Sequence, residues 1–410
     1  MQITGSIVWA ACNPILTLAI VLSVGIFMSR NGTVSAKDSK MLSTILINTF
    51  YPCLLFTNVI LGVSSANLKS FLIMTLASAV ILACGSLLGI LILKLTNPPE
   101  GFRYGTVMAT AMGNYGDMVL AIVVSLGNLP PFANGDAAKG VAYVAAFICF
   151  TNIFFFTIGF KYIGEDFKKL KTTELEETAI ADPEQNKADL AFLIIDDTTN
   201  ANAGSSSRDP QQIDVVEDER SHSVRNPRFK LSESSKFWIT TIANPCNIAT
   251  VLGLIVTMIP ALRSLFYDPS GSSQPLSFAF KSFSLIGGGA VPIGILNVGT
   301  ALGRLTPKKF APPRVIGAIA FCRLVIMPVI GIAAVQAMAV NGVIDANDKM
   351  MRFVLMLQTA VPTASSAVYI TQFWHPEGDA DAIASVILVQ YGVALVTITF
   401  ALTIMLSLLT

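Results

Sequence analysis

The chain contains ten apolar stretches, each long enough to cross a lipid bilayer as a helix. A hydrocarbon core of about 30 Å needs about 20 apolar residues per helix. The stretches are 6–28, 41–61, 70–94, 104–126, 139–160, 238–260, 277–302, 313–338, 350–374 and 382–409. Charged residues make up only 13% of the sequence, whereas a soluble domain carries about 25%. We therefore predict an all-α, multi-pass membrane protein.

A hydrophilic stretch divides the ten predicted helices into two groups of five. Residues 161–236 hold most of the acidic residues of the chain and few aromatic ones, and a segment of that composition cannot bury enough apolar surface to fold. We expect a disordered loop there, between a first five-helix repeat at 1–160 and a second at 237–410. Lys and Arg gather beside the helix ends on the side of the loop, which the positive-inside rule assigns to the cytosol.

Two of the predicted helices carry helix-breaking residues at matching places. The interrupted segments are 103–127, with Gly113-Asn114-Tyr115-Gly116-Asp117, and 352–374, with Val361-Pro362-Thr363-Ala364-Ser365-Ser366. They align without a gap, so that Gly113 meets Pro362 and Asn114 meets Thr363. Such paired interruptions in two halves of a membrane protein point to the substrate site of a transporter. Lipid cannot satisfy the backbone groups that a break frees, so both segments must face protein, water or a ligand.

Other helix pairs repeat features in the same order. The matched features are Asn13-Pro14 with Asn244-Pro245, and Pro52 followed by Asn58 with Pro292 followed by Asn297. An odd number of helices per repeat gives the two copies opposite orientations in the membrane, which is the inverted-repeat design of secondary carriers. The sequence thus predicts ten transmembrane helices built as two inverted five-helix repeats.

Asp117 is the only carboxylate deep inside a predicted span. A charge at that depth is costly, so an intramembrane acid is a candidate for function by default. Asp117 follows Asn114 by three residues, and the two side chains would share one face of a helix. Three roles stay open: a proton carrier, a cation ligand, or a hydrogen-bond partner of the backbone that the break frees.

Arg323 lies about ten residues into the predicted span 313–338. A long basic side chain near the end of a span can reach the interface with its charged group. We expect Arg323 to snorkel to the cytosolic surface in this way. The alternatives are an ion pair with Asp117 and the attraction of an anionic substrate.

Neutral hydrogen-bonding side chains at the two breaks form the predicted binding site. Half-helices that begin there would aim their positive dipole ends into a cavity, which suits a carboxylate. The candidate substrate-binding residues are Gly113, Asn114, Asp117, Pro362, Thr363, Ser365, Ser366, Asn58 and Asn297. The alternative for the Ser, Thr and Asn side chains is hydrogen bonding between helices, as is common in membranes.

Several classes of function have no support in the sequence. No Ser–His–Asp arrangement, HExxH motif or phosphate-binding loop is present, so an enzyme or an ATP-driven pump is not expected. No cofactor or metal site is predicted. The net charge of +1 gives no basis for nucleic-acid binding. The expected partners are the lipid membrane and a small solute.

Four motifs in the two helical halves form a recognisable set. They are Asn48 to Asn58 around Pro52, Gly113-Asn114-Tyr115-Gly116, Arg323-Leu324 with Pro328, and Pro362 followed by Thr371-Gln372-Phe373. This set resembles the auxin efflux carrier family, and its PIN-like branch with fungal members most of all. The resemblance implies crossed, broken helices four and nine, a homodimer, alternating access of the elevator type, and transport of indole-3-acetate or related organic anions. It also implies that Asn114 binds the substrate carboxylate, and it favours the endoplasmic reticulum membrane over the plasma membrane.

The chain departs from the family pattern at both breaks. The family usually continues its Gly-Asn-x-Gly motif with Asn-Leu-Pro, where this chain has Asp117-Met118-Val119, and Ser365 stands where the family has Asn in the ninth helix. The added carboxylate would repel an anion unless it is protonated or paired. The leading prediction is a secondary transporter of a small organic anion. The alternatives are a proton- or cation-coupled exchanger that uses Asp117, and a non-transporting membrane sensor that signals through the loop.

Overall fold

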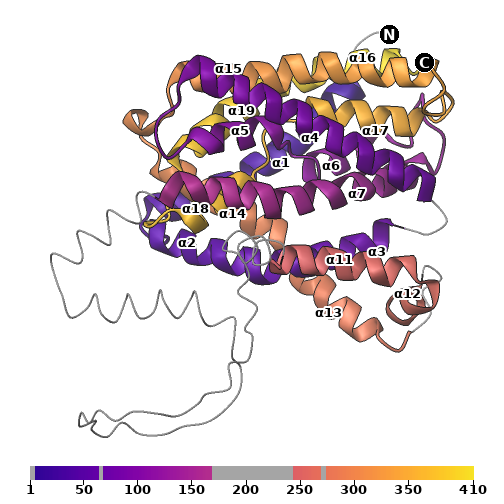
Figure 1. Ribbon diagram of the computed structural model, residues 1–410, viewed down its shortest axis with the longest axis horizontal. Helices are drawn as coiled ribbons and strands as arrows, with labels where there is room; N and C mark the ends of the chain where they lie inside the picture. Colours follow the sequence, from indigo (N-terminus) through magenta and orange to yellow (C-terminus); the bar gives the residue numbers. More distant parts are fainter. Residues whose placement is uncertain (1–4, 64–67, 169–242, 269–273) are drawn as a thin grey trace, which may run out of the picture. The chain divides into compact units, whose positions relative to one another are not determined.

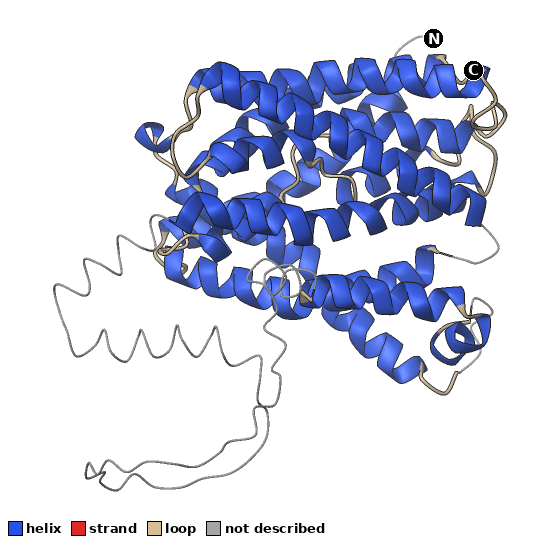
Figure 2. Ribbon diagram, viewed as in Figure 1, coloured by secondary structure: helices blue, strands red, loops and turns tan. Residues whose placement is uncertain are grey.

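The computed structural model describes residues 5–63, 68–168, 243–268 and 274–410, and this part of the chain is helical without a strand (Figures 1 and 2). The first half contains α1 (Gly5–Arg30), α2 (Ala36–Ile45), a π-helical turn (Leu46–Phe50), α3 (Tyr51–Gly62), α4 (Leu68–Thr96), α5 (Arg103–Ala111), α6 (Asp117–Leu126), α7 (Asp136–Phe154) and a second π-helical turn (Phe155–Gly159). Residues 160–168 continue the helix that α7 begins.

The second half of the chain is likewise built from helices of different lengths. It contains α11 (Pro245–Met258), α12 (Pro260–Phe266), α13 (Ser277–Gly288), α14 (Ala290–Arg304), α15 (Pro313–Phe321), a π-helical turn (Cys322–Ile326), α16 (Met327–Val340), α17 (Lys349–Ala360), α18 (Ser366–Trp374) and α19 (Asp381–Ser407).

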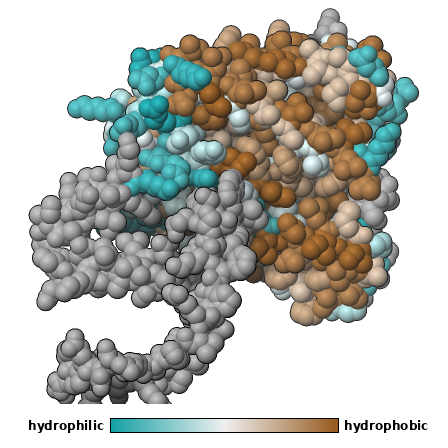
Figure 3. Space-filling view, viewed as in Figure 1, coloured by the Kyte–Doolittle hydropathy of each residue, from teal (hydrophilic) through white to brown (hydrophobic). Residues whose placement is uncertain are grey.

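Seven continuous helical stretches in the described residues are long and apolar enough to cross a membrane. They are Cys12–Arg30, Ala36–Gly62, Leu68–Thr96, Asp136–Lys168, Ser277–Arg304, Pro313–Val340 and Asp381–Ser407. Figure 3 shows hydrophobic residues over the middle of the visible face and hydrophilic ones toward its left and right ends. Large apolar side chains such as Leu76 and Phe400 are 66% exposed, which suits contact with lipid rather than water. The chain is an integral, multi-pass membrane protein.

The sixth predicted span, 238–260, is wrong in its extent. Residues 238–242 lie outside the described residues, and α11 begins at Pro245, where the Asn244 side chain accepts a hydrogen bond from the backbone N–H of Cys246. After α11 the chain turns by 112° into α12. Pro260 explains this turn, because it lacks an N–H and pushes the residue before it into an extended conformation; Ile259 has φ −105° and ψ 100°.

The helix predicted at 139–160 runs further, to Lys168. A tertiary contact accounts for the extension, since the Asp166 carboxylate accepts hydrogen bonds from the backbone N–H groups of Tyr104 (3.1 Å) and Gly105 (2.8 Å) at the start of α5. The loop expected at 161–236 therefore begins with eight helical residues, 161–168. The rest of that prediction lies outside the described residues.

Helices α5 and α17 are the most enclosed of the central helices. Every residue of α5 from Gly105 to Ala111 is buried, and so is nearly all of α17. Helix α4 packs on α5, α7 on α6, and α16 and α19 on α17, so that longer helices surround the short ones (Figure 1). Helices that stop within the membrane are tolerated only in such protein surroundings.

Candidate functional site: two broken helices that cross

The first break separates α5 from α6. Met112 leaves the helical conformation (φ −94°, ψ 111°), and α6 begins five residues later at Asp117. Gly113 and Gly116 lie between the two helices, and glycine costs about 1 kcal/mol relative to alanine inside a helix. Local sequence therefore weakens the helix where it ends.

The second break separates α17 from α18. Val361 is extended (φ −86°, ψ 148°), as expected for a residue that precedes proline. Pro362 cannot donate the hydrogen bond that would continue α17. The next helix, α18, begins at Ser366.

The two breaks meet and pair their backbones. Gly113 and Thr363 form an isolated antiparallel bridge. The N–H of Asn114 donates to the carbonyl of Pro362 (2.7 Å), and the N–H of Ala364 donates to the carbonyl of Met112 (3.0 Å). Each break thus satisfies backbone groups that the other leaves free, and the predicted contact between the interrupted segments is present.

Arg323 lies beneath this crossing, fully buried, in the π-helical turn between α15 and α16. Its Nη2 donates to the carbonyl of Val361 (2.6 Å), and its Nη1 donates to the hydroxyl of Tyr115 (3.1 Å) and, more weakly, to the carbonyl of Thr110 (3.5 Å). The guanidinium therefore bonds the last carbonyls of both α5 and α17, where the helix dipole favours a positive charge.

The expectation that Arg323 would snorkel to the surface is wrong. The break carbonyls, which only the tertiary structure brings beside it, satisfy its charge inside the protein. No salt bridge joins Arg323 to Asp117 within the described residues. The structure also explains Gly113, because a Cβ at that position would overlap Nη2 of Arg323.

Two side chains of helix α19 form hydrogen bonds with the residues of the crossing. Gln390 accepts a hydrogen bond from the N–H of Thr363 (2.8 Å) and donates one to its hydroxyl (3.0 Å). The Tyr391 hydroxyl accepts a hydrogen bond from the side-chain amide of Asn114 (2.9 Å). Sequence reasoning missed both residues, although a Gln-Tyr pair inside an apolar span is a signal that could have indicated them.

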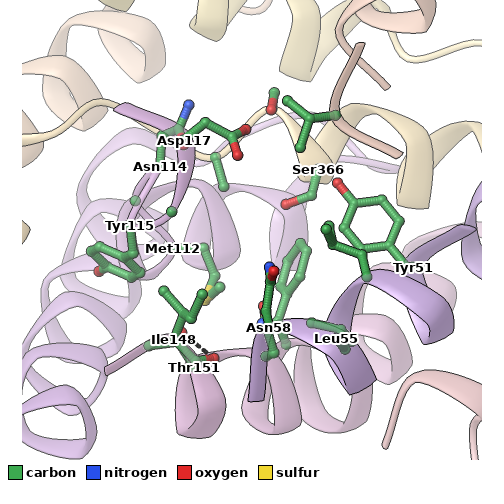
Figure 4. Close-up of a pocket in the computed structure, with 18 of the residues that line it drawn as sticks. Tyr51, Leu55, Asn58, Met112, Asn114, Tyr115, Asp117, Ile148, Thr151 and Ser366 are labelled. Atoms are coloured by element: carbon green, nitrogen blue, oxygen red, sulfur yellow. Dashed lines mark hydrogen bonds between the residues drawn. The ribbon is translucent and has the colours of Figure 1, made fainter. Parts of the chain in front are cut away.

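A cavity of about 310 Å³ opens beside the crossing. Its polar lining residues are Asn58, Asn114, Asp117, Thr151, Asn152, Ser365 and Ser366, and its aromatic ones are Tyr51, Tyr115, Phe155, Phe156 and Tyr369. Figure 4 shows Asn58 reaching into the cavity from α3, opposite Asp117 and Ser366. A concave, largely apolar pocket with a few convergent polar groups is typical of a small-molecule site.

Comparison with known proteins agrees with this architecture. The model of a family described as membrane transport protein matches residues 10–402. This chain belongs to that family of membrane transport proteins. The predicted resemblance to the auxin efflux carriers and their PIN-like branch is confirmed.

Similar proteins from a plant and a yeast align with nearly the whole length of this chain. Protein PIN-LIKES 2 of Arabidopsis thaliana is 25% identical, over 94% of this chain and 92% of its own length. Protein PIN-LIKES 5 of the same plant is 24% identical over 98% and 99%. An uncharacterized transporter of Saccharomyces cerevisiae is 20% identical over 97% and 98%.

The structure divides the predicted binding residues of this family member into three groups. Six line the cavity: Asn58, Gly113, Asn114, Asp117, Ser365 and Ser366. Pro362 and Thr363 do not line it but hold the crossing together. The third group is Asn297 alone, which lies outside the cavity lining.

Asn297 is a link between helices. Its fully buried amide nitrogen donates to the Ser43 hydroxyl and to Oε1 of Gln372, both at 2.8 Å. These bonds join α14 to α2 and α18, which is the interhelical role that the sequence left open as an alternative. Asn297 therefore lies at a helix interface in this structure, and a role in binding stays a prediction.

Asp117 stands apart from the other lining residues because it is the only acid among them, and none of them is basic. It is the first residue of α6. No hydrogen bond or salt bridge to its carboxylate is present in the part of the chain that the structure describes. In the same part of the chain, no three His, Cys, Asp or Glu residues gather as metal ligands.

Proposed function

We propose that this protein is a secondary transporter that carries a small organic anion across the membrane, with the cavity beside the crossed helices as its binding site. Membership of a family of membrane transport proteins supports transport as such. The observation that carries the anion assignment is the position of two helix starts. Helices α6 and α18 begin at Asp117 and Ser366, and both residues line the same cavity.

The first N–H groups of a helix have no partner within it, and the helix dipole makes that end positive. Two such ends that face one cavity form a site suited to a carboxylate. The rings of Tyr51, Phe155 and Phe156 also line the cavity and suit the flat apolar body of an aromatic acid. An auxin-like acid such as indole-3-acetate combines both features.

Alternating access follows from an inverted repeat. The described residues contain seven continuous spans and the bent pair α11–α12, and the proposal adds the broken pairs α5–α6 and α17–α18 as two more, which makes ten. Five precede residues 169–242 and five follow them. The Gly113–Thr363 bridge lies within one residue of the Gly113–Pro362 match of the aligned halves. In a carrier of this design, one bundle of helices moves against the other and exposes the binding site to the two sides of the membrane in turn.

Uptake into proteoliposomes tests the proposal. The purified full-length protein would be offered labelled indole-3-acetate and benzoate, with neutral indole-3-acetamide and cationic tryptamine as matched probes. We expect saturable uptake of the anions above that of protein-free vesicles. An absence of saturable uptake, or a preference for tryptamine, would contradict the proposal.

We also propose the endoplasmic reticulum as the location, by analogy with the PIN-like branch. Fluorescence microscopy of the tagged full-length chain with markers of both membranes tests this. A signal confined to the plasma membrane would exclude it.

A further inference from the structure

We propose that Asp117 binds one proton together with each monovalent anion, so that the protein is an electroneutral proton–anion symporter; this inference rests on the proposed anion transport. The starting observation is geometric. The single carboxylate of the cavity lies at the start of α6, on the same wall as Ser366 at the start of α18. A substrate carboxylate attracted by the two helix starts would come to lie beside it.

The groups around Asp117 supply no compensating positive charge. Tyr51 from α3, Tyr369 from α18 and Tyr115 from the break line the same cavity, and Tyr391 from α19 lies behind Asn114. The basic side chain that bonds the crossing is that of Arg323. Its two terminal nitrogens already bond carbonyls and the Tyr115 hydroxyl.

An ionised Asp117 would therefore oppose the binding of an anion. Two unit charges about 6 Å apart, at an effective dielectric constant of about 20, repel strongly enough to lower affinity about a hundredfold. Protonation of Asp117 removes this repulsion and leaves the helix starts free to bind the substrate. The loaded state is then favoured when proton and anion bind together.

A proton suits this site better than a divalent metal cation. Ca²⁺ and Mg²⁺ bind through six or more oxygen ligands, with carboxylates prominent among them. The cavity offers one carboxylate, and the described residues contain no cluster of further acids around it. A proton needs only one carboxylate oxygen.

The transport cycle balances in charge. On one side of the membrane the Asp117 carboxylate takes up a proton and becomes a carboxylic acid, and the anion binds. On the other side both leave, and the carboxylate returns empty. The loaded and empty carriers have the same charge, so one complete cycle moves no net charge.

The test compares wild type with Asp117→Asn in proteoliposomes, using labelled indole-3-acetate and initial rates corrected for protein-free vesicles. For wild type, we expect a pH gradient at zero membrane potential to drive uptake, and a potential at equal pH to have no effect. The Asn variant cannot take up the proton, so its uptake should ignore the pH gradient and follow the potential. Its driving force is then a tenfold concentration ratio for about every 59 mV.

Asp136→Asn is the matched control, because Asp136 is likewise in the first turn of a helix, α7, but outside the cavity. This variant should behave as wild type does. Wild-type uptake driven by potential, or a pH response that survives in Asp117→Asn, would overturn proton coupling while leaving anion transport intact. If Asp117→Asn transports nothing, a solid-supported-membrane recording decides on wild type alone, and a sustained transport current would refute electroneutrality. Absence of any wild-type uptake would instead refute the proposed function itself.

Discussion

Replacing Arg323 by glutamine should destabilise the crossing, although Arg323 itself does not line the cavity. The guanidinium makes two short hydrogen bonds, to the Val361 carbonyl (2.6 Å) and the Tyr115 hydroxyl (3.1 Å). A hydrogen bond to a charged group contributes about 1.5–3 kcal/mol, which gives roughly 3–6 kcal/mol for the pair. Removing a buried charge also removes its desolvation cost, so we expect a net loss of about 2–4 kcal/mol.

This loss should appear as a lower unfolding midpoint of the purified protein in detergent. A change of 1 kcal/mol shifts Tm by about 2–4 °C in chains of 150–250 residues and by less in longer ones. For this chain of 410 residues we take about 1–2 °C per kcal/mol, so the expected decrease in Tm is roughly 2–8 °C. The Tm of Arg323→Lys should lie between those of wild type and Arg323→Gln, because a single ammonium cannot bond both breaks as the guanidinium fork does.

Arg314→Gln is the matched control. It removes the same charge from α15, the helix that leads into the π-helical turn of Arg323, but Arg314 is exposed. Its Tm should stay within about 1 °C of wild type, because surface changes cost little. Equal midpoints for Arg323→Gln and Arg314→Gln would refute the assignment of Arg323 as the support of the crossing.

Three further pairs of substitutions probe the crossing and the limits of the cavity. Gly113→Ala should lower stability by about 1–3 kcal/mol, because the added Cβ overlaps the buried Arg323. Gly116→Ala should leave Tm unchanged, because the added Cβ has no neighbour within 4 Å. Equal unfolding midpoints for these two variants would contradict this reasoning. Thr363→Val removes both bonds of its hydroxyl and should lower stability by about 1–3 kcal/mol, with Thr363→Ser as control, and an unchanged Tm would count against it. Asn297→Leu should lower Tm but keep the KM of uptake, while Asn58→Leu should raise KM with little change in Tm; a raised KM in Asn297→Leu would place that residue in the binding site.

The positions of both breaks could be predicted because local chemistry determines them. Pro362 cannot continue a helix, and the glycines of the first break weaken one. Their occurrence at the same place in two apolar segments then indicated that they would meet. Asp117 could be singled out for a similar reason, since a carboxylate in an apolar span is conspicuous without any structure.

The role of Arg323 could not be predicted, and the sequence could not choose between the two roles it left open for Asn297, because both depend on partners far along the chain. Arg323 finds its acceptors at Thr110 and Val361, and none of the three roles that the sequence suggested for it involved these carbonyls. Asn58 and Asn297 both follow a proline within a predicted span. Yet Asn58 lines the cavity, whereas Asn297 lies at a helix interface. Pattern matching locates a polar residue in a span but does not show which neighbour it meets.

The central claim is that a transported solute binds in the cavity beside the crossed helices. An experimental structure of the protein with a transported aromatic acid bound tests this claim most directly. We predict solute density between Asn58 on α3 and the helix starts at Asp117 and Ser366. Density elsewhere, for example in the apolar groove of about 200 Å³ between α4 and α16, with the cavity beside the crossing empty, would contradict it.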